Sequence, residues 1–231
     1  SAALPELARQ LALSGGSFTK EVVERMQQAL GLAIWLMAPC FVILATRSEE
    51  LVNLFFRHFR FSAVDAAQTA QALTAYSFAL LPYGIIKVLT AFYFATERTS
   101  YALKATGISL VVSIAANSML VGTYGHIGLA TATACSLSTN AFVLLFGLRR
   151  HSISWEQKKV LKSTLYVALA TLLAVCLISV SADLVNELLT VFNFHNKLRA
   201  LTDICISGLI TVTVFGVALK YGHNLGPREV K

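Results

Sequence analysis

Residues Ala105–Leu148 have the sequence ATGISLVVSIAANSMLVGTYGHIGLATATACSLSTNAFVLLFGL, 44 consecutive positions without an Asp, Glu, Lys or Arg. About 20 apolar residues, each adding 1.5 Å of helical rise, cross a hydrocarbon core of roughly 30 Å. The run is therefore long enough for two membrane-spanning helices. Its middle, GTYGHIG at Gly122–Gly128, is typical of a tight turn between them.

Four further charge-free runs, of 16 to 21 residues, occur at Met26–Thr46, Ala66–Ile86, Ser163–Ala182 and Ile204–Leu219. Of the 231 residues, 56% are hydrophobic and only 13% are charged, whereas soluble domains carry about 25% charged residues. A soluble all-helical protein is the alternative, but these runs leave almost no polar face to meet water. The sequence therefore predicts an all-α integral membrane protein.

We expect six membrane-spanning helices, with bounds near Val23–Ala45, Ala63–Ala95, Tyr101–Val121, Ile127–Leu148, Leu161–Ala182 and Leu198–Tyr221. The second helix starts with a capping signal, because Ser62 is followed three residues later by Asp65. Pro39 and Pro82 fall inside the first and second helices. Each proline removes a backbone donor and favours a kink.

The lysine and arginine residues predict the orientation, because cytoplasmic loops of membrane proteins are enriched in them. Loops on one side hold 13 of the 19, and the opposite loops hold 5, namely Arg47, Arg57, Arg60, Lys197 and Arg199. We therefore expect both termini in the cytoplasm. The basic linker 151–162, with Trp155, either anchors this topology or also meets anionic headgroups. The net charge of +7 is mostly this bias and is poor evidence for nucleic-acid binding.

Motifs for catalysis or cofactor binding are not legible in the sequence. Cys40, Cys135, Cys176 and Cys205 each fall within a predicted span without a close pairing, so they imply neither a disulfide framework nor a zinc site. The sequence has no P-loop, no GxGxxG and no nucleophile with an orienting partner. We expect no enzymatic activity, no cofactor and no metal.

Lys87 is the sole cation in the middle of a predicted span. A lysine at a helix centre costs about 3 kcal/mol on insertion scales, so such residues normally face a bundle interior or a water-filled path. Alternatively, Lys87 snorkels to the cytoplasmic surface, since Ala95 is only about 12 Å further along the helix. Tyr76 and Tyr83 share its helical face, and we expect these three residues to line a substrate cavity.

Asn117 and Asn140 lie deep in the third and fourth predicted helices. Amides in such positions usually form hydrogen bonds across helices, so structural packing is one interpretation. Contact with a substrate is the other. We include both residues among the candidate cavity residues.

Several segments together carry a family resemblance: ALPELARQLA near the start, FRFSAVDAAQTAQALTAYSFAL, IIKVL around Lys87, and GHIGLATATACSLSTNAFVLLFGLRR. From Ala3 to about Arg150 the chain resembles the C-terminal half of the MviN-type lipid II flippases, also called MurJ. That family belongs to the multidrug/oligosaccharidyl-lipid/polysaccharide exporter superfamily. The matching positions are Phe61, Asp65, Thr69, Ala72, Leu73, Ala75, Tyr76, Lys87, Asn117, His126, Gly128, Leu129, Asn140, Arg149 and Arg150. Ala91 departs from the pattern, which has proline there, and TERTSYA lacks the proline of the family's turn.

The resemblance implies a fourteen-helix fold, of which this chain would hold the ninth to fourteenth helices. Residues 1–22 would be a cytoplasmic stub after an earlier helix, and 23–150 a four-helix part of the C-lobe. Residues 151–162 would be the linker, and 163–231 two C-terminal helices with a cytoplasmic tail. The last two helices match by position and hydropathy only, and the resemblance implies that they form a groove for a polyprenyl tail.

The implied function is translocation of undecaprenyl-pyrophosphate-linked peptidoglycan precursor, lipid II, across the bacterial inner membrane for cell-wall synthesis and cell shape. The implied partners are this lipid, the surrounding membrane lipids and the missing N-terminal half of the protein. Two alternatives stay open. One is a related exporter of drugs or polysaccharide, and the other is a truncated membrane fragment that does not transport.

Overall fold

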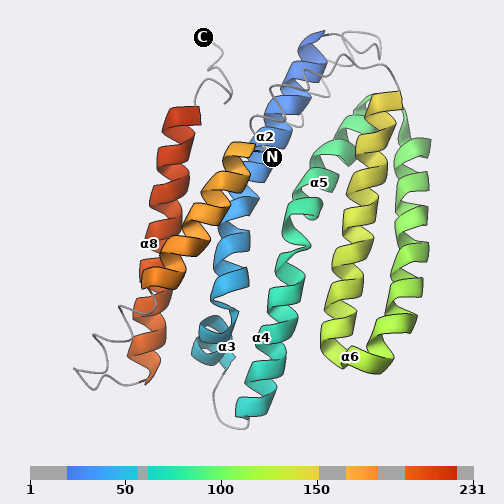
Figure 1. Cartoon of the computed structure of the whole chain (residues 1–231). Coiled ribbons are helices and arrows are strands. Elements are labelled where there is room, and N and C mark those ends of the chain that lie inside the picture. The colour runs from blue at the N-terminus through green and yellow to red at the C-terminus, as the bar shows by residue number, and fades with distance from the viewer. Residues whose placement is uncertain (1–19, 57–61, 151–164, 182–195, 223–231) are drawn as a thin grey trace.

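The computed structural model describes residues 20–56, 62–150, 165–181 and 196–222, almost all of them helical. The helices are α2 (Lys20–Thr46), α3 (Ser48–Phe56), α4 (Ala63–Ser77), α5 (Leu80–Ala95), α6 (Thr99–Arg150), the helix Leu165–Ser181, and α8 (Asn196–Gly222). The long helices run roughly along one direction, so the bundle is a broad layer in side view (Figure 1). Residues 1–19 of the expected stub (1–22), Phe61, the linker with Trp155 and the C-terminal tail after Gly222 lie outside the described residues.

Three helices are long and apolar enough to cross a membrane, and a fourth span results if the bent pair α4–α5 counts as one. Large apolar side chains such as Leu103, Met119 and Leu209 are exposed on the helices. A soluble monomer rarely exposes apolar surface on this scale, whereas a membrane protein presents it to lipid. The prediction of an all-α integral membrane protein is confirmed.

The long helix α6 folds back on itself at Gly125, as the sequence predicted for GTYGHIG. Gly125 has φ 52° and ψ −123°, a conformation that is readily available only to glycine. The hydroxyl of Ser136 donates to the carbonyl oxygen of Ser109 at 2.7 Å, so the two arms lie side by side. Both arms are visible as neighbouring antiparallel helices (Figure 1). The third and fourth predicted helices are therefore the arms of one hairpin.

The second predicted helix is divided into α4 and α5, which meet at an angle of 41°. Pro82 is the third residue of α5. Its ring would clash with the carbonyl of Phe78, four residues earlier, so the helix breaks at Phe78–Ala79. The predicted cap at its start is confirmed, since Ser62 and Asp65 form a complete capping box. Pro39, in contrast, lies within a continuous α2.

The interior is divided between two main clusters of buried side chains. One joins α2, α5 and both ends of α6, and it includes Met26, Phe92, Tyr93 and Leu144. The ring of Tyr93 stacks on that of Tyr101 with centroids 5.2 Å apart, and the Tyr93 hydroxyl donates to the Leu144 carbonyl at 2.9 Å. This cluster holds the hairpin α6 against α5.

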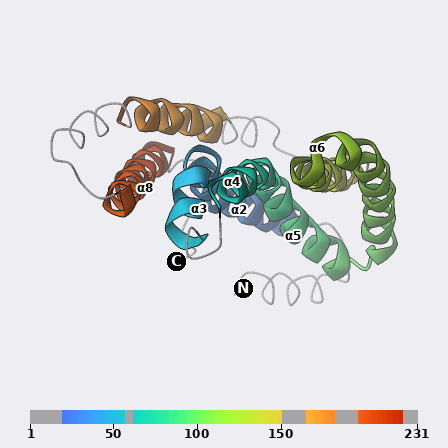
Figure 2. The same ribbon diagram turned by 90° about the horizontal axis from the view of Figure 1, so that it is seen from below.

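The second cluster joins α2 to the two C-terminal helices. Ala38 and Val42 of α2 pack against Ala174 and Ile178, and Phe215 closes the cluster from α8. The ring of Trp35 meets that of Phe215 edge-on at 5.8 Å. Viewed from below, the C-terminal helices lie at the opposite end of the layer from α6, with α2 between them (Figure 2). One helix, α2, therefore contributes to both clusters.

The helix α3 was not predicted from the sequence. It follows α2 after a break at Arg47 and spans only nine residues. Its residues Ser48 and Val52 are buried, and the Ser48 and Thr74 hydroxyls lie 2.6 Å apart, which ties α3 to α4. The short helix fills the corner between α2, α4 and α8.

Candidate functional site

A stripe of polar and aromatic side chains runs along exposed faces of α4 and α5. Asp65, Thr69 and Tyr76 follow one another at helical spacing on α4 and are exposed. On α5 the exposed residues Tyr83 and Lys87 are one turn apart. The Lys87 Nζ lies over the Tyr83 ring, 5.1 Å from its centroid, an arrangement in which the ring's electron-rich face attracts the ammonium.

The helix break separates the predicted group of three aromatic and basic residues. Tyr83 and Lys87 are in contact, but Tyr76 lies on α4, on the other side of the 41° bend. Tyr76 and Tyr83 are 41% and 43% exposed, so each still presents its ring at the surface of the chain. Polar and aromatic residues are therefore exposed on both α4 and α5, but the bend between Tyr76 and Tyr83 turns the two parts of the stripe in different directions.

Within the described helices, Asn117 and Asn140 do not form the cross-helix hydrogen bonds that one interpretation of the sequence favoured. The Asn117 Nδ2 donates to the carbonyl of Ser113, one turn back in its own helix, at 2.8 Å. Asn140 is 7% exposed, and its Oδ1 has no hydrogen-bond partner among the described residues. The arms of α6 are instead linked by the Ser136 hydroxyl, which donates to the Ser109 carbonyl, and by the Tyr101 hydroxyl, which donates to the Val143 carbonyl.

The asparagines also lie far apart along the hairpin. Ser109 is opposite Ser136, and Asn117 lies eight residues from Ser109 toward the turn. Asn140 lies four residues from Ser136 in the other direction, so the two amides are about 18 Å apart along the axis. The structure does not bring Asn117 and Asn140 together.

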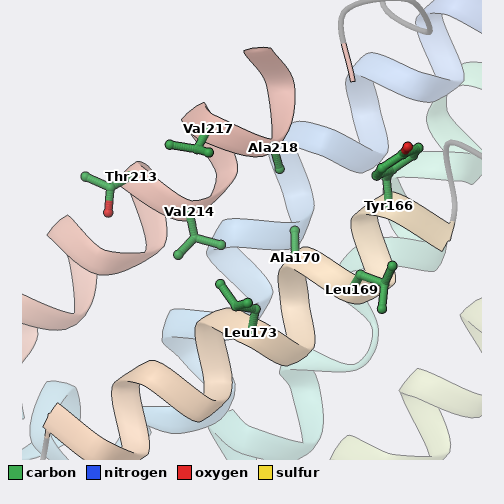
Figure 3. A pocket seen from close by; sticks show the side chains of 8 residues that line it. All are labelled: Tyr166, Leu169, Ala170, Leu173, Thr213, Val214, Val217 and Ala218. Carbon is green, nitrogen blue, oxygen red and sulfur yellow. The ribbon is translucent and has the colours of Figure 1, made fainter. Parts of the chain in front are cut away.

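An apolar groove lies between the helix Leu165–Ser181 and α8 (Figure 3). It has a volume of about 350 Å³ and is lined by Tyr166, Leu169, Ala170, Leu173, Thr213, Val214, Val217 and Ala218. The hydroxyl of Thr213 donates to the carbonyls of Leu209 and Ile210 within α8, so it is already engaged in its own helix. The chemistry of this lining suits a hydrocarbon chain and offers almost nothing to a polar ligand.

Arg47 is a residue whose place the sequence did not predict. It was expected as a charge in a loop, but it is only 6% exposed. Its guanidinium donates to Ser207 of α8, to Glu50 of α3, and to the carbonyl of Ile178 in the helix Leu165–Ser181. On α8, Ser207, Thr211 and Phe215 recur every four residues, so they share one helical face, and all three are buried. This spacing of two hydroxyl residues was the sequence signal that could have indicated a buried polar partner on α8.

Apolar helices long enough to cross a membrane, with an exposed polar stripe and an apolar groove between the helix Leu165–Ser181 and α8, are together typical of a multi-pass membrane protein. The sequence model of the family described as "Lipid II flippase MurJ" matches residues 1–198. The chain belongs to the MurJ family.

Individual relatives agree with this assignment. A protein from Buchnera aphidicola subsp. Baizongia pistaciae, described as a probable lipid II flippase MurJ, is 27% identical over 206 residues, 88% of this chain and 40% of its own length. A protein of the same description from Rickettsia prowazekii is 24% identical over 95% of this chain and 41% of its own length. The chain thus spans about 40% of the length of these relatives.

A solved structure shows that the fold is shared. "Lipid II flippase MurJ, inward closed conformation" matches with a TM-score of 0.75 at 21% identity, over 95% of this chain and 43% of that chain. The likeness includes the last two helices, because only 5% of this chain lies outside it. The sequence had related those two helices to the family by position and hydropathy alone.

Proposed function

We propose that this chain forms the C-terminal part of a flippase that translocates lipid II, the undecaprenyl-pyrophosphate-linked peptidoglycan precursor, across the bacterial inner membrane. The observation that carries the proposal is the family match over residues 1–198. The chain would act with a portion that corresponds to the remaining length of its relatives. In such transporters a site between two halves is opened alternately to each side of the membrane.

The proposed topology has six spans and both termini in the cytoplasm. These spans are α2, the bent pair α4–α5, the two arms of α6, the helix Leu165–Ser181 and α8. The shortest of them, with 17 residues, extends about 26 Å, which nearly crosses the hydrocarbon core. The proposed division is a four-helix part over 23–150 and a two-helix part over 163–231, joined by the basic linker 151–162.

The polar stripe is the proposed wall of the headgroup cavity, with Tyr76, Tyr83 and Lys87 as its main residues. An exposed lysine that faced lipid near a helix centre would cost about 3 kcal/mol, so a water-filled path or a second protein surface is favoured. A pyrophosphate group carries negative charge that the Lys87 ammonium can partly neutralise. Asn117 and Asn140 are the proposed secondary polar contacts, since each has a carbonyl oxygen without a hydrogen-bond partner among the described residues.

The apolar groove is the proposed site for the polyprenyl tail. Its walls carry the exposed side chains Leu169, Leu173 and Val217, which offer dispersion contacts along the length of an isoprenoid chain. A headgroup on the stripe and a tail in the groove would hold the two chemically different parts of one lipid on separate surfaces of the chain.

The test uses cells depleted of their own flippase that express this chain together with the portion it lacks. Lys87→Leu should reduce lipid II export by about tenfold, as expected when one charge-assisted contact is lost. Lys87→Arg keeps the charge and should retain most of the export. Equal export by the Leu and Arg variants, at equal protein abundance, would remove Lys87 from the cavity and favour the snorkelling interpretation.

A further inference from the structure

The surroundings of Arg47 bring three elements together at one guanidinium group. The Nε donates to the Ser207 Oγ at 2.8 Å, and Nη1 donates to the Glu50 Oε1 at 2.9 Å. The Nη2 is 3.4 Å from the carbonyl oxygen of Ile178. Ser207 is fully buried, and Glu50 is partly buried, so these bonds form away from bulk water. Hydrogen bonds from a charged donor in such surroundings are among the stronger ones in proteins.

The partners of Arg47 come from different helices. Ile178 is in the last turn of the helix Leu165–Ser181, where carbonyl groups carry partial negative charge, and its carbonyl also accepts a hydrogen bond from the Ser181 hydroxyl at 2.9 Å. Ser207 lies in the middle of α8. Arg47 itself stands at the break between α2 and α3. A single side chain therefore joins both C-terminal helices to the main bundle.

Arg47 contacts the middle of α8 and the C-terminal end of the helix Leu165–Ser181, and the groove lies further along both helices. Val214, in the groove, is seven residues beyond Ser207, about 10 Å along α8. On the partner helix, Leu173 precedes Ile178 by five residues, about 8 Å. The groove therefore begins a short distance along both helices from the point where Arg47 contacts them.

We propose that Arg47 is a positioning residue, which holds the helix Leu165–Ser181 and α8 at a fixed spacing and thereby sets the width of the apolar groove between them. The binding of a polyisoprenoid chain in that groove rests on the proposed function, whereas the spacing of the helices does not. The planar fork of arginine is required because its partners lie in three directions. A lysine would keep the charge but could not reach all three of them.

The experiment measures helix spacing in the full chain, purified in lipid nanodiscs. Nitroxide labels at Leu169→Cys and Val217→Cys, which are exposed on opposite walls of the groove, report its width through their dipolar coupling. The native cysteines are replaced, since all four are free and exposed. Arg47→Lys leaves the charge pattern and hence the topology signal unchanged. We expect it to broaden and shift the distance distribution.

Glu50→Gln and Glu49→Gln form the matched pair. Both change an acidic residue in the first turn of α3, but only Glu50 contacts Arg47, while Glu49 is exposed. Glu50→Gln should shift the distances in the direction of Arg47→Lys, and Glu49→Gln should match the wild type. Unchanged distances in both Arg47→Lys and Glu50→Gln, with helicity retained, would overturn the proposal.

Binding of undecaprenyl phosphate to the same samples separates the role of Arg47 in helix spacing from the role of the groove as a site for a lipid tail. Trp35 contacts Phe215, which follows the groove residue Val214 in sequence, so in a Trp155→Phe background its fluorescence reports the binding of bromine-labelled undecaprenyl phosphate. Wild-type quenching that weakens about fivefold in Arg47→Lys supports a role of the spacing in lipid affinity. Shifted distances without any wild-type quenching would support the positioning role and contradict the groove as a tail site.

Discussion

The Nε of Arg47 donates a hydrogen bond to the Oγ of Ser207 across 160 positions of sequence, at 2.8 Å. Arg47 follows the first described helix and Ser207 lies in the last one, and the bond is buried. It connects the break between α2 and α3 to α8. The packing of that pair on α2 consequently combines an apolar interface with a polar contact at one end.

Ser207→Ala should lower the free energy of unfolding by about 1–3 kcal/mol, because the buried Arg47 Nε would lose its acceptor. The neighbouring substitution Gly208→Ala is the control, since a Cβ there meets no atom within 4 Å. Reversible unfolding in mixed micelles measures both. Equal stability of the two variants would mean that the Arg47–Ser207 bond contributes nothing measurable.

Gly125→Ala should destabilise the hairpin α6 by about 1–3 kcal/mol, because an alanine is strained at φ 52° and ψ −123°. Gly122→Ala tests the same loop without that constraint, as Gly122 has open space around its Cβ position. Alanine is the better helix former by about 0.5–1 kcal/mol, so Gly122→Ala should be neutral or stabilising. Limited proteolysis at the turn, with thermal unfolding, compares the two. A tolerated Gly125→Ala would rule out the positive φ.

Gly147→Ala should loosen the contact between α5 and the second arm of α6. An added Cβ would overlap the ring of Tyr101 and lie 2.5 Å from the Tyr93 hydroxyl. Overpacking of this kind costs about 1–3 kcal/mol. Gly107→Ala, in the first arm and facing open space, should be tolerated. The comparison requires only the melting temperatures of the two variants in the same detergent, and a smaller loss for Gly147→Ala would contradict the packing described.

Membrane topology is tested by cysteines at exposed positions in a cysteine-free background. Glu49→Cys and Thr123→Cys should react with an impermeant thiol reagent added outside intact cells, and Ser100→Cys should react only after permeabilisation. Ser48 is unsuitable for this purpose because it is buried and hydrogen-bonded to Thr74. Labelling of Ser100→Cys from outside would reverse the orientation that the lysine and arginine distribution predicts.

Most of the fold could be predicted from the sequence, because the lengths of the apolar runs, and the glycine and proline residues that interrupt them, largely determine where the helices of a membrane protein begin and end. The charge-free run around GTYGHIG predicted the hairpin, and Pro82 predicted the bend, although not its consequence for Tyr76. The helix α3 was missed since its nine residues are too short for a span and follow a charged residue directly. A run of nine residues between two predicted spans is too short to be distinguished from a loop by its sequence pattern.

The candidate site was less predictable, because it depends on contacts between distant segments. The pairing of Tyr83 with Lys87 is local and was foreseen from helical spacing. The burial of Arg47 was not, since its partners Ile178 and Ser207 lie more than a hundred residues away. In the sequence, Arg47 looks like a charge at the membrane surface, because it immediately follows a long apolar run. It is buried in the structure only because the last two helices pack against it.

Complementation decides whether this chain is part of a lipid II flippase. Cells depleted of their own flippase would express the chain alone, the portion corresponding to the rest of its relatives alone, or both as separate polypeptides. We predict that growth and lipid II export return only with both. This chain provides one cation, Lys87, in the middle of a proposed span, which is too little to offset the desolvation of a pyrophosphate group. Rescue by the chain alone would contradict its assignment as one part of a two-part transporter, and no rescue by the pair, with both proteins present in the membrane, would contradict the flippase function itself.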